Sequence, residues 1–527
     1  MTDFLREWMG GPWAGKTMLA LRCSFFAFFA ILSLLLVFPG ADTLRQGAAG
    51  RGQRLLAVLA VCGFAAIAAF QGRWQLFGAS DARLMRFVRR HNARPGVDVR
   101  RGAILDRNGS VLAIDGEGGV RRQPLGPAAA HVVGYADPMA GLAGIEKAAD
   151  ESLSGSGESP MEGLGRLGKG VISPAPVEGR DFRTTLDARL QRFAFNALKG
   201  RRGAVVALLP ETGEILALAS APSFDPIRPR AVREASAGDA PLLNRAIQGR
   251  YPPGSTFKVV MSLIAADLGI APILDCPASG YRAEGESRPI RDSEYYTYAR
   301  DGRVWKGFGR IGLREALVHS SNVYFAQLSR RIPPEAFNAY VALLGLNDRR
   351  TLCGDGKSAL VASASSVPLL DAKNAKSIVQ LAIGQGRMLA TPLCVALWTS
   401  VAAAGGELAE PTLALGHAAV RHRVVSRAAA DNVADMMREA VRAGTGRAAD
   451  IPGLGVCGKT GTAQNPGGDD HSWFTCFTSR TRPRLVVTVL VENGGYGSRG
   501  AAPVARQVIE EAVRLGLVAP VAGKDGK

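Results

Sequence analysis

Residues 251–260 read Tyr-Pro-Pro-Gly-Ser-Thr-Phe-Lys-Val-Val, and this stretch decides which fold the chain is expected to adopt. The two prolines and Gly254 end an extended segment and lead into a helix. Ser255 is expected in the first turn of that helix and Lys258 one turn later, because side chains three positions apart share a face. A Ser hydroxyl attacks well only when a neighbouring base takes its proton, and burial makes a Lys amine such a base by lowering its pKa. The pair therefore predicts nucleophilic catalysis by Ser255.

Two further short elements follow along the chain, and each occurs once in the sequence. Ser320-Ser321-Asn322 is the only Ser-x-Asn, and Lys459-Thr460-Gly461-Thr462 is the only Lys-Thr-Gly. The first offers a hydroxyl that relays a proton and an amide that holds a substrate backbone. The second offers a cation and hydroxyls for a substrate carboxylate, and its glycine permits close approach of a substrate backbone to a strand edge. Lys258 is the only Lys with a Ser three positions before it, so three unique elements indicate one catalytic site.

Turn signals and apolar periodicity predict an α+β fold in which helices pack on a sheet. Asn108-Gly109 within residues 100–116 indicates a hairpin, and residues 151–181, rich in Gly, Ser and Pro, indicate a domain boundary. Thr185 is the predicted cap of a helix that carries Leu190, Phe193 and Leu198. Further helices are expected near residues 255–269, 311–330, 430–443 and 503–515. Strands are expected near residues 204–209, 215–219, 455–463, 472–478 and 484–492, the first two as a second hairpin.

The first 75 residues are expected to anchor the chain in a membrane. Residues 17–38 are mostly apolar and long enough to span a bilayer, and Trp8 and Trp13 precede them where an interfacial belt would lie. Residues 55–70 form a second apolar run that is short for a span, so one or two transmembrane segments are expected. The arginines that follow each apolar run favour a cytoplasmic location for the segments that carry them. The chemistry expected of the three motifs requires instead that residues 76 onward lie outside the cytoplasm.

Composition narrows the classes of partner. The chain has 527 residues and a net charge of +18, but its basic residues are spread along it without a run interleaved with aromatics. No nucleic-acid partner is therefore expected, and anionic lipid or cell-wall polymer fits the charge better. Only 12 of the 64 basic residues are Lys, which leaves 52 Arg. Lys258 and Lys459 are expected to be required as Lys, because Arg does not lose its proton in a protein.

No metal or other cofactor is expected. The seven Cys include no Cys-x-x-Cys, and no His/Cys cluster has the spacing of metal ligands. Two disulfides remain open, Cys276 with Cys353 and Cys457 with Cys476, the alternative for the second pair being small buried thiols.

Four polar residues beside the motifs are interpreted as non-catalytic. His319 and His471 are expected to be structural, because Lys already supplies the base. Asp469 and Asp470 are expected in a loop near the site rather than as catalytic acids.

The motifs resemble those of the penicillin-recognising serine transpeptidases, the superfamily of penicillin-binding proteins and serine β-lactamases. Within it the chain is similar to class B penicillin-binding proteins. The similarity extends to residues 101–109 with 112–113, 144–146, 153–155, 244–246, 384–386, 391–392 and 444–446. The resemblance covers roughly residues 100–515. It implies a membrane anchor over residues 1–75, a small pedestal domain over residues 76–180 and a transpeptidase domain over residues 181–520, with an antiparallel sheet covered by helices.

The resemblance implies a serine-type D-Ala-D-Ala transpeptidase or carboxypeptidase that cross-links peptidoglycan stem peptides. Ser255 would attack the carbonyl between two terminal D-alanines, and an amine of a neighbouring stem would take the acyl group. Lys258 would be the base in acylation. Ser320 would pass the proton to the leaving group, with Lys459 tuning it, and Asn322 would position the substrate.

The same resemblance implies the binding groups and the partners. Thr460, Gly461 and Thr462 would bind the substrate, and the backbone N–H groups of Ser255 and Thr462 would form the oxyanion hole. β-Lactams would trap Ser255 because they mimic D-Ala-D-Ala. The expected location is the plasma membrane with the catalytic domain outside, beside a membrane glycosyltransferase of the SEDS type.

Two other functions stay open. A β-lactamase would need an efficient water-activating base for deacylation, and no such motif is evident. A β-lactam sensor or scaffold would need a recognisable output module, and none is present in the sequence. The chain departs from the family pattern at Cys457, where a small residue is usual two positions before Lys459, and in its short pedestal.

Overall fold

The computed structural model describes residues 63, 100–116, 120–137, 139–155, 179–231, 239–283, 288–371, 377–465, 467–479 and 481–521. The described residues from 100 onward belong to one compact unit. The expected membrane segments, residues 17–38 and 55–70, lie outside the described residues apart from Gly63. Within the described ranges, no helix has the length and apolarity that a bilayer crossing requires.

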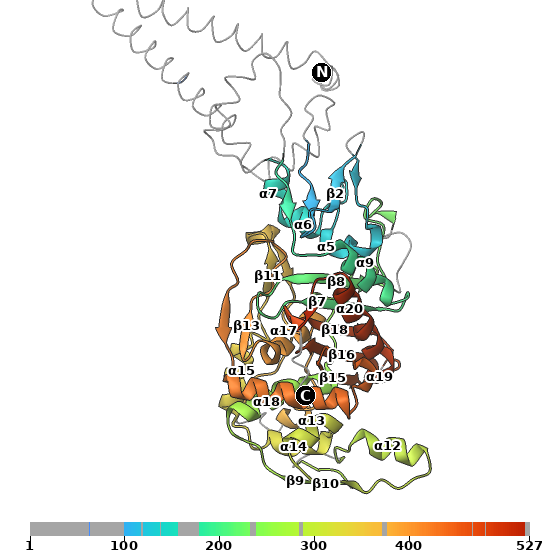
Figure 1. Cartoon of the computed structure of the whole chain (residues 1–527), viewed down its shortest axis with the longest axis vertical. Helices are drawn as coiled ribbons and strands as arrows, with labels where there is room; N and C mark the ends of the chain where they lie inside the picture. The colour runs from blue at the N-terminus through green and yellow to red at the C-terminus, as the bar shows by residue number, and fades with distance from the viewer. Residues whose placement is uncertain are drawn as a thin grey trace, which may run out of the picture. The chain divides into compact units, whose positions relative to one another are not determined.

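A five-stranded antiparallel sheet forms the centre of the fold (Figure 1). Its strands lie in the order β15 (Val456–Ala463), β16 (His471–Thr478), β18 (Val486–Val491), β7 (Gly203–Leu208) and β8 (Ile215–Ala221). The residues of the three central strands are nearly all buried, because helices cover both faces of the sheet. All five strands were predicted from the sequence, and the α+β expectation is confirmed.

Each face of the sheet packs against its own group of helices. Alternate side chains of β7 point to opposite faces, so Val205 joins the cluster with α9 (Ala188–Ala197) and α20 (Ala502–Arg514). Val206 points the other way, into the cluster formed with α11 (Lys258–Asp267), α17 (Pro392–Ala403) and α18 (Arg427–Arg442). The second cluster positions Ser255 and Lys258, because α11 directly follows the turn that carries Ser255.

Shorter elements surround this core. The helices are α12 (Ser293–Arg300), α13 (Leu313–His319), α14 (Asn322–Ser329), α15 (Pro334–Leu343), α16 (Ile378–Leu381) and α19 (Gly497–Gly500). The strand pairs are β9 (Leu274–Pro277) with β10 (Gly307–Ile311), β11 (Arg350–Cys353) with β12 (Leu360–Ala362), β13 (Glu407–Ala409) with β14 (Arg421–Arg423), and β17 (Thr481–Arg482) with β19 (Ala519–Pro520).

Residues 100–155 with 179–183 form an N-terminal lobe. Its sheet has the order β3 (Arg121–Arg122), β2 (Val111–Asp115), β1 (Ile104–Leu105) and β6 (Phe182–Arg183). The predicted hairpin joins β1 to β2, and Gly109 takes the positive φ of 85° that its turn requires. Short helices and one strand pair complete the lobe: α5 (Ala130–Val133), α6 (Gly144–Ala148), α7 (Asp150–Leu153), and β4 (Ala136–Asp137) with β5 (Gly141–Leu142).

A buried ion-pair cluster holds this lobe together. Glu146 is fully buried, and its two carboxylate oxygens accept hydrogen bonds from Arg101 Nε at 2.7 Å and Arg121 Nε at 2.6 Å. Arg101 also pairs with Asp150 at 2.6 Å, and Arg121 with Asp115 at 2.9 Å. Pairing of this kind is required because an isolated charge in the interior is costly.

Two local predictions need correction. The helix expected after Thr185 begins after Asp187 instead, whose carboxylate accepts from the N–H groups of Arg189 and Leu190. Thr185 Oγ1 is unavailable for capping because it donates to Ile215 O at 2.8 Å. The single helix expected near residues 311–330 is two helices, α13 and α14, for a reason that lies in the site.

The cysteines carry no disulfide in the described part of the chain. Cys276, Cys353, Cys457 and Cys476 are all free and buried, so neither open pairing is present. Cys476 lies opposite Gly458 in the sheet and therefore out of register with Cys457.

Candidate active site

Ser255 lies in a single 3₁₀ turn, Gly254–Phe257, that continues directly into α11. The predicted helix therefore begins with a tighter turn, in which positions i and i+3 are eclipsed. Gly254 has φ +54°, and its N–H donates to Gly384 O at 2.9 Å. A Cβ on Gly384 would lie 2.0 Å from Gly254 O, which explains a glycine at the start of Gly384-Gln385-Gly386. Ser255 itself is half-buried at the surface of this turn.

The segment before Ser255 is fastened to the central sheet. Trp473 Nε1 donates to Pro252 O at 3.0 Å, and Tyr251 OH donates to Glu492 Oε1 at 2.7 Å. Glu492 also pairs with Arg245 at 2.7 Å. These contacts fix the segment that leads to Ser255, since β16 and the end of β18 hold this segment from one side.

Lys258 is fully buried one turn after Ser255. Its Nζ donates to Ser320 O at 2.6 Å, to Asn322 Oδ1 at 2.6 Å and to Ser320 Oγ at 3.3 Å. Burial lowers the pKa of Lys258 to about 7, against the smaller opposing influence of Asp292 and Glu294. The predicted pairing of motifs is thus present, although no hydrogen bond joins Lys258 to Ser255 among the described residues.

Ser320 interrupts the helical conformation between α13 and α14, and this interruption is here called the break. It has left-handed backbone angles, φ 61° and ψ 37°, a rare conformation for a residue with a Cβ. Ser321 then caps α14 by accepting from Tyr324 N at 3.1 Å. The break turns both Ser320 oxygens and the Asn322 amide oxygen toward one amine, that of Lys258.

Asp292 supports this break from the start of α12. Its carboxylate is buried, and Oδ1 accepts from Ser321 Oγ at 3.0 Å and from Val323 N at 3.1 Å. Its neighbour Arg291 accepts from Asn322 Nδ2 through its carbonyl at 3.0 Å. Asp292 was not among the residues that the sequence singled out, and its position before a helix was the one available signal.

Lys459 is the second fully buried lysine, on strand β15. Its Nζ donates to Thr460 O at 3.1 Å, and it forms no salt bridge with any described residue. Burial and the charge of Lys258 lower the pKa of Lys459 well below its usual value, while Glu294 opposes them. The charge states of Lys258 and Lys459, the two lysines expected to be required as Lys, are therefore coupled.

The remaining predicted residues lie along β15. Thr460 Oγ1 hydrogen-bonds to Thr445 Oγ1 at 2.8 Å, and Thr462 Oγ1 accepts from Gly497 N at 3.4 Å. A Cβ on Gly461 would lie 2.8 Å from Thr256 Cγ2, so a larger residue would displace the turn that carries Ser255. Gly461 therefore lies against the turn that carries Ser255, with Thr460 and Thr462 on either side of it in the strand.

The two histidines interpreted as structural differ in setting. His471 Nδ1 accepts from Asn493 N at 3.2 Å, and its ring meets Tyr251 edge-on at 5.5 Å. Burial lowers the pKa of His471. His319 is exposed and stacks on Phe308 at 5.3 Å.

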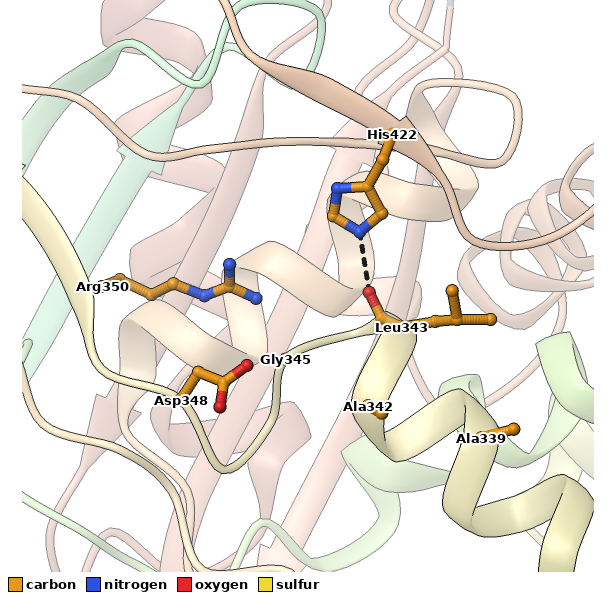
Figure 2. Close-up of a pocket in the computed structure, with 7 residues that line it drawn as sticks. All are labelled: Ala339, Ala342, Leu343, Gly345, Asp348, Arg350 and His422. Atoms are coloured by element: carbon orange, nitrogen blue, oxygen red, sulfur yellow. Dashed lines mark hydrogen bonds between the residues drawn. The ribbon is translucent and has the colours of Figure 1, made fainter.

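A separate pocket of about 560 Å³ lies at the end of α15 (Figure 2). His422 Nε2 donates to Leu343 O at 2.7 Å, and Arg350 donates to Leu344 O at 2.8 Å. Both side chains thereby satisfy carbonyls at the end of the helix. None of the predicted catalytic residues lines this pocket, so we assign it no part in the chemistry.

Comparison with known proteins decides the family. Residues 203–510 match the transpeptidase family described as the penicillin-binding protein transpeptidase domain. The peptidoglycan D,D-transpeptidase PbpA of Mycobacterium tuberculosis is 30% identical over 436 residues, which are 73% of this chain and 82% of that protein. The chain belongs to the class B penicillin-binding proteins.

Other class B penicillin-binding proteins support the same placement. The peptidoglycan D,D-transpeptidase MrdA of Acinetobacter baumannii is 29% identical over 459 residues, 74% of this chain but 65% of the relative's length. The ceftriaxone acyl-enzyme complex of penicillin-binding protein A from M. tuberculosis superposes with a TM-score of 0.67 at 29% identity. That alignment covers 79% of this penicillin-binding protein and 98% of the other chain.

Proposed function

We propose that this penicillin-binding protein is a peptidoglycan D,D-transpeptidase that cross-links stem peptides through an acyl-enzyme on Ser255. One observation carries the proposal. Lys258 is a fully buried lysine, one turn after Ser255, with a pKa of about 7 and hydrogen bonds to both Ser320 and Asn322. A neutral amine in that position is a general base. The relatives named above, peptidoglycan D,D-transpeptidases and a ceftriaxone acyl-enzyme, support the same reaction.

Acylation follows from this arrangement. Neutral Lys258 takes the proton of the Ser255 hydroxyl as the oxygen attacks the carbonyl carbon between the two terminal D-alanines. The bond to the last D-alanine breaks, and its nitrogen receives a proton through Ser320 Oγ, 3.3 Å from Lys258 Nζ. An amine of a second stem, or water in a carboxypeptidase reaction, then takes the acyl group from Ser255.

The proposed oxyanion hole uses the N–H groups of Ser255 and Thr462. A Cβ on Gly254 would lie 2.6 Å from Thr462 O, so the Thr462 carbonyl faces the turn of the nucleophile. In an antiparallel strand the N–H and C=O of one residue point to the same side. The Thr462 N–H therefore opens toward Ser255, from the free edge of β15.

Lys459, Thr460 and Thr462 would receive the substrate's terminal carboxylate. Lys459 makes no salt bridge with any described residue, so an arriving carboxylate would favour its charged form and would pair with it where screening is weak. Gly461 between the threonines keeps the strand edge open to an extended substrate backbone. Asn322 would fix the substrate from the opposite side while its Oδ1 holds Lys258.

The setting of the enzyme is part of the proposal. Residues 1–75 would anchor it in the plasma membrane through one or two segments, with residues 76–180 as a pedestal and residues 181–520 as the transpeptidase domain outside. The apolar runs and the flanking tryptophans support the anchor. The peptidoglycan substrate would come from a membrane glycosyltransferase of the SEDS type, and β-lactams would be covalent inhibitors.

Mass spectrometry after reaction with a penicillin tests the assignment. One adduct is expected on the peptide that contains Ser255, and Ser255→Ala should abolish it. An adduct that persists in Ser255→Ala would overturn the proposal. Rapid penicillin turnover would indicate a β-lactamase instead, and stable acylation without cross-linking of stem peptides would indicate a sensor.

A further inference from the structure

Residues 293–310, here named the aromatic arm, extend away from the core beside the catalytic motifs. The arm contains α12, in which no residue is buried, and the first part of β10. Figure 1 shows α12 projecting beyond α14 and the β9–β10 pair. A helix without a buried face gains little from packing, so its position needs another explanation.

A row of rings leads along the arm from the active site. His319, which precedes Ser320, stacks on Phe308 at 5.3 Å. Phe308 contacts Trp305 at 4.9 Å, and Trp305 contacts Tyr298 at 5.1 Å. Successive ring contacts hold the row in one conformation at low entropic cost.

Both ends of the arm are tied to the catalytic break. At one end Asp292 holds Ser321, and at the other Phe308 stacks on His319. A ligand bound on the arm would therefore lie next to Ser320 without contacting the acylation centre itself.

Cations accompany the rings. Arg303 lies over the ring of Tyr298 at 4.1 Å. Lys306 and Arg310 are exposed and make no salt bridge with any described residue. The acidic side chains of the arm are Glu294 and Asp301, so the arm is net positive and suits an anionic ligand.

We propose that the aromatic arm binds an un-cross-linked peptidoglycan strand, the sugars stacking on the rings and the stem carboxylates pairing with the cations. The proposal rests on the proposed function, because the strand must reach the acyl-enzyme on Ser255. Sugar rings have CH-rich faces that stack on aromatic faces, and carboxylates pair with arginine. A protein partner fits less well. Within the arm only Tyr296 and Val304 are large apolar residues that are more than half exposed, too few for the apolar centre of an interface.

Binding of purified un-cross-linked strands to the full-length protein in detergent tests the proposal. The double variant Arg303→Ala/Trp305→Ala should weaken binding by at least about tenfold, because it removes a stacking face and a cation. Acylation by a fluorescent penicillin should stay near the wild-type rate. Trp305→Phe keeps a ring and should restore most of the binding. Arg506→Ala, at a partly exposed position of α20 outside the arm, is the charge-matched control.

Three results would overturn the inference while leaving penicillin acylation, and so the proposed function, intact. The first is wild-type strand binding by the double variant and also by Arg303→Glu, which reverses the charge of an exposed side chain and removes its pair with Asp301 at 3.6 Å. The second is equal loss of binding in Arg506→Ala. The third is a double variant that loses binding to anionic lipid vesicles while its strand binding is unchanged. That result would assign the arm to the membrane surface. Absence of a penicillin adduct in the wild type would contradict the proposed function instead.

Discussion

The N-terminal lobe and the active site both bury charge, but they treat it in opposite ways. Glu146 lies between Arg101 and Arg121, with a guanidinium nitrogen within 2.7 Å of each carboxylate oxygen. Lys258 and Lys459 are equally buried, yet they donate only to uncharged oxygens among the described residues. A compensated charge stays ionised and fixes geometry, whereas an uncompensated lysine is pushed toward its neutral form. The difference separates a buried charge that supports the fold from the two buried lysines for which we propose a chemical role.

Lys258→Met should produce the largest effect on activity. Without the base, the acylation rate by penicillin is expected to fall about 10²–10⁴-fold. The thermal midpoint should be at least that of the wild type, because an uncompensated cation is removed. Since the folded pKa of Lys258 is about 7 and the unfolded one 10.5, any stability gain should be full below pH 7 and shrink as pH rises toward 10.5. A large loss of stability at neutral pH would mean that Lys258 is a structural residue.

Glu146→Gln should have the opposite effects to Lys258→Met, a loss of stability without a loss of activity. Two buried guanidinium groups lose their shared partner, so the free energy of unfolding in urea should fall by about 3–5 kcal/mol. The acylation rate of the folded fraction should be unchanged. Glu439→Gln is the matched control, because its pair with Arg314 at 3.3 Å is exposed and should contribute less than about 1 kcal/mol. Equal losses of unfolding free energy in the two variants would contradict the structural role given to the buried Glu146 cluster.

Asp292→Ala should disturb the site without removing a reacting group. The break at Ser320 loses the two hydrogen bonds that Asp292 accepts, and the acylation rate should fall by about 10–100-fold. Asp292 raises the pKa of Lys258, so the pH midpoint of acylation should also move below the wild-type value. A purely structural role would lower the rate and leave that midpoint in place.

Glu294→Gln should give the smallest change. Glu294 also raises the pKa of Lys258, but less than Asp292 does, so the acylation midpoint should shift down by less than in Asp292→Ala. The plateau rate at high pH should stay near that of the wild type. A midpoint that rises in Glu294→Gln would contradict the sign of this interaction.

Local patterns predicted the five strands of the sheet well, because strand alternation is a property of neighbouring residues. The roles of the three motifs stay predictions. The capping residue of α9 was missed, since Thr185 and Asp187 are both good caps and only a tertiary hydrogen bond to Ile215 O separates them. The break at Ser320 carries no Gly or Pro. Its conformation depends on Lys258 and Asp292, residues far away in the sequence, and so it required the structure.

The pH dependence of penicillin acylation by the wild-type protein tests the central claim most directly, because it reports the ionisation of the base in the free enzyme. The second-order rate of acylation should rise with pH as Lys258 loses its proton, with a midpoint near 7. Lys258→Met should lack that transition. A midpoint near 10.5, the ordinary value for lysine, would show that burial does not prepare Lys258 as a base and would contradict the account.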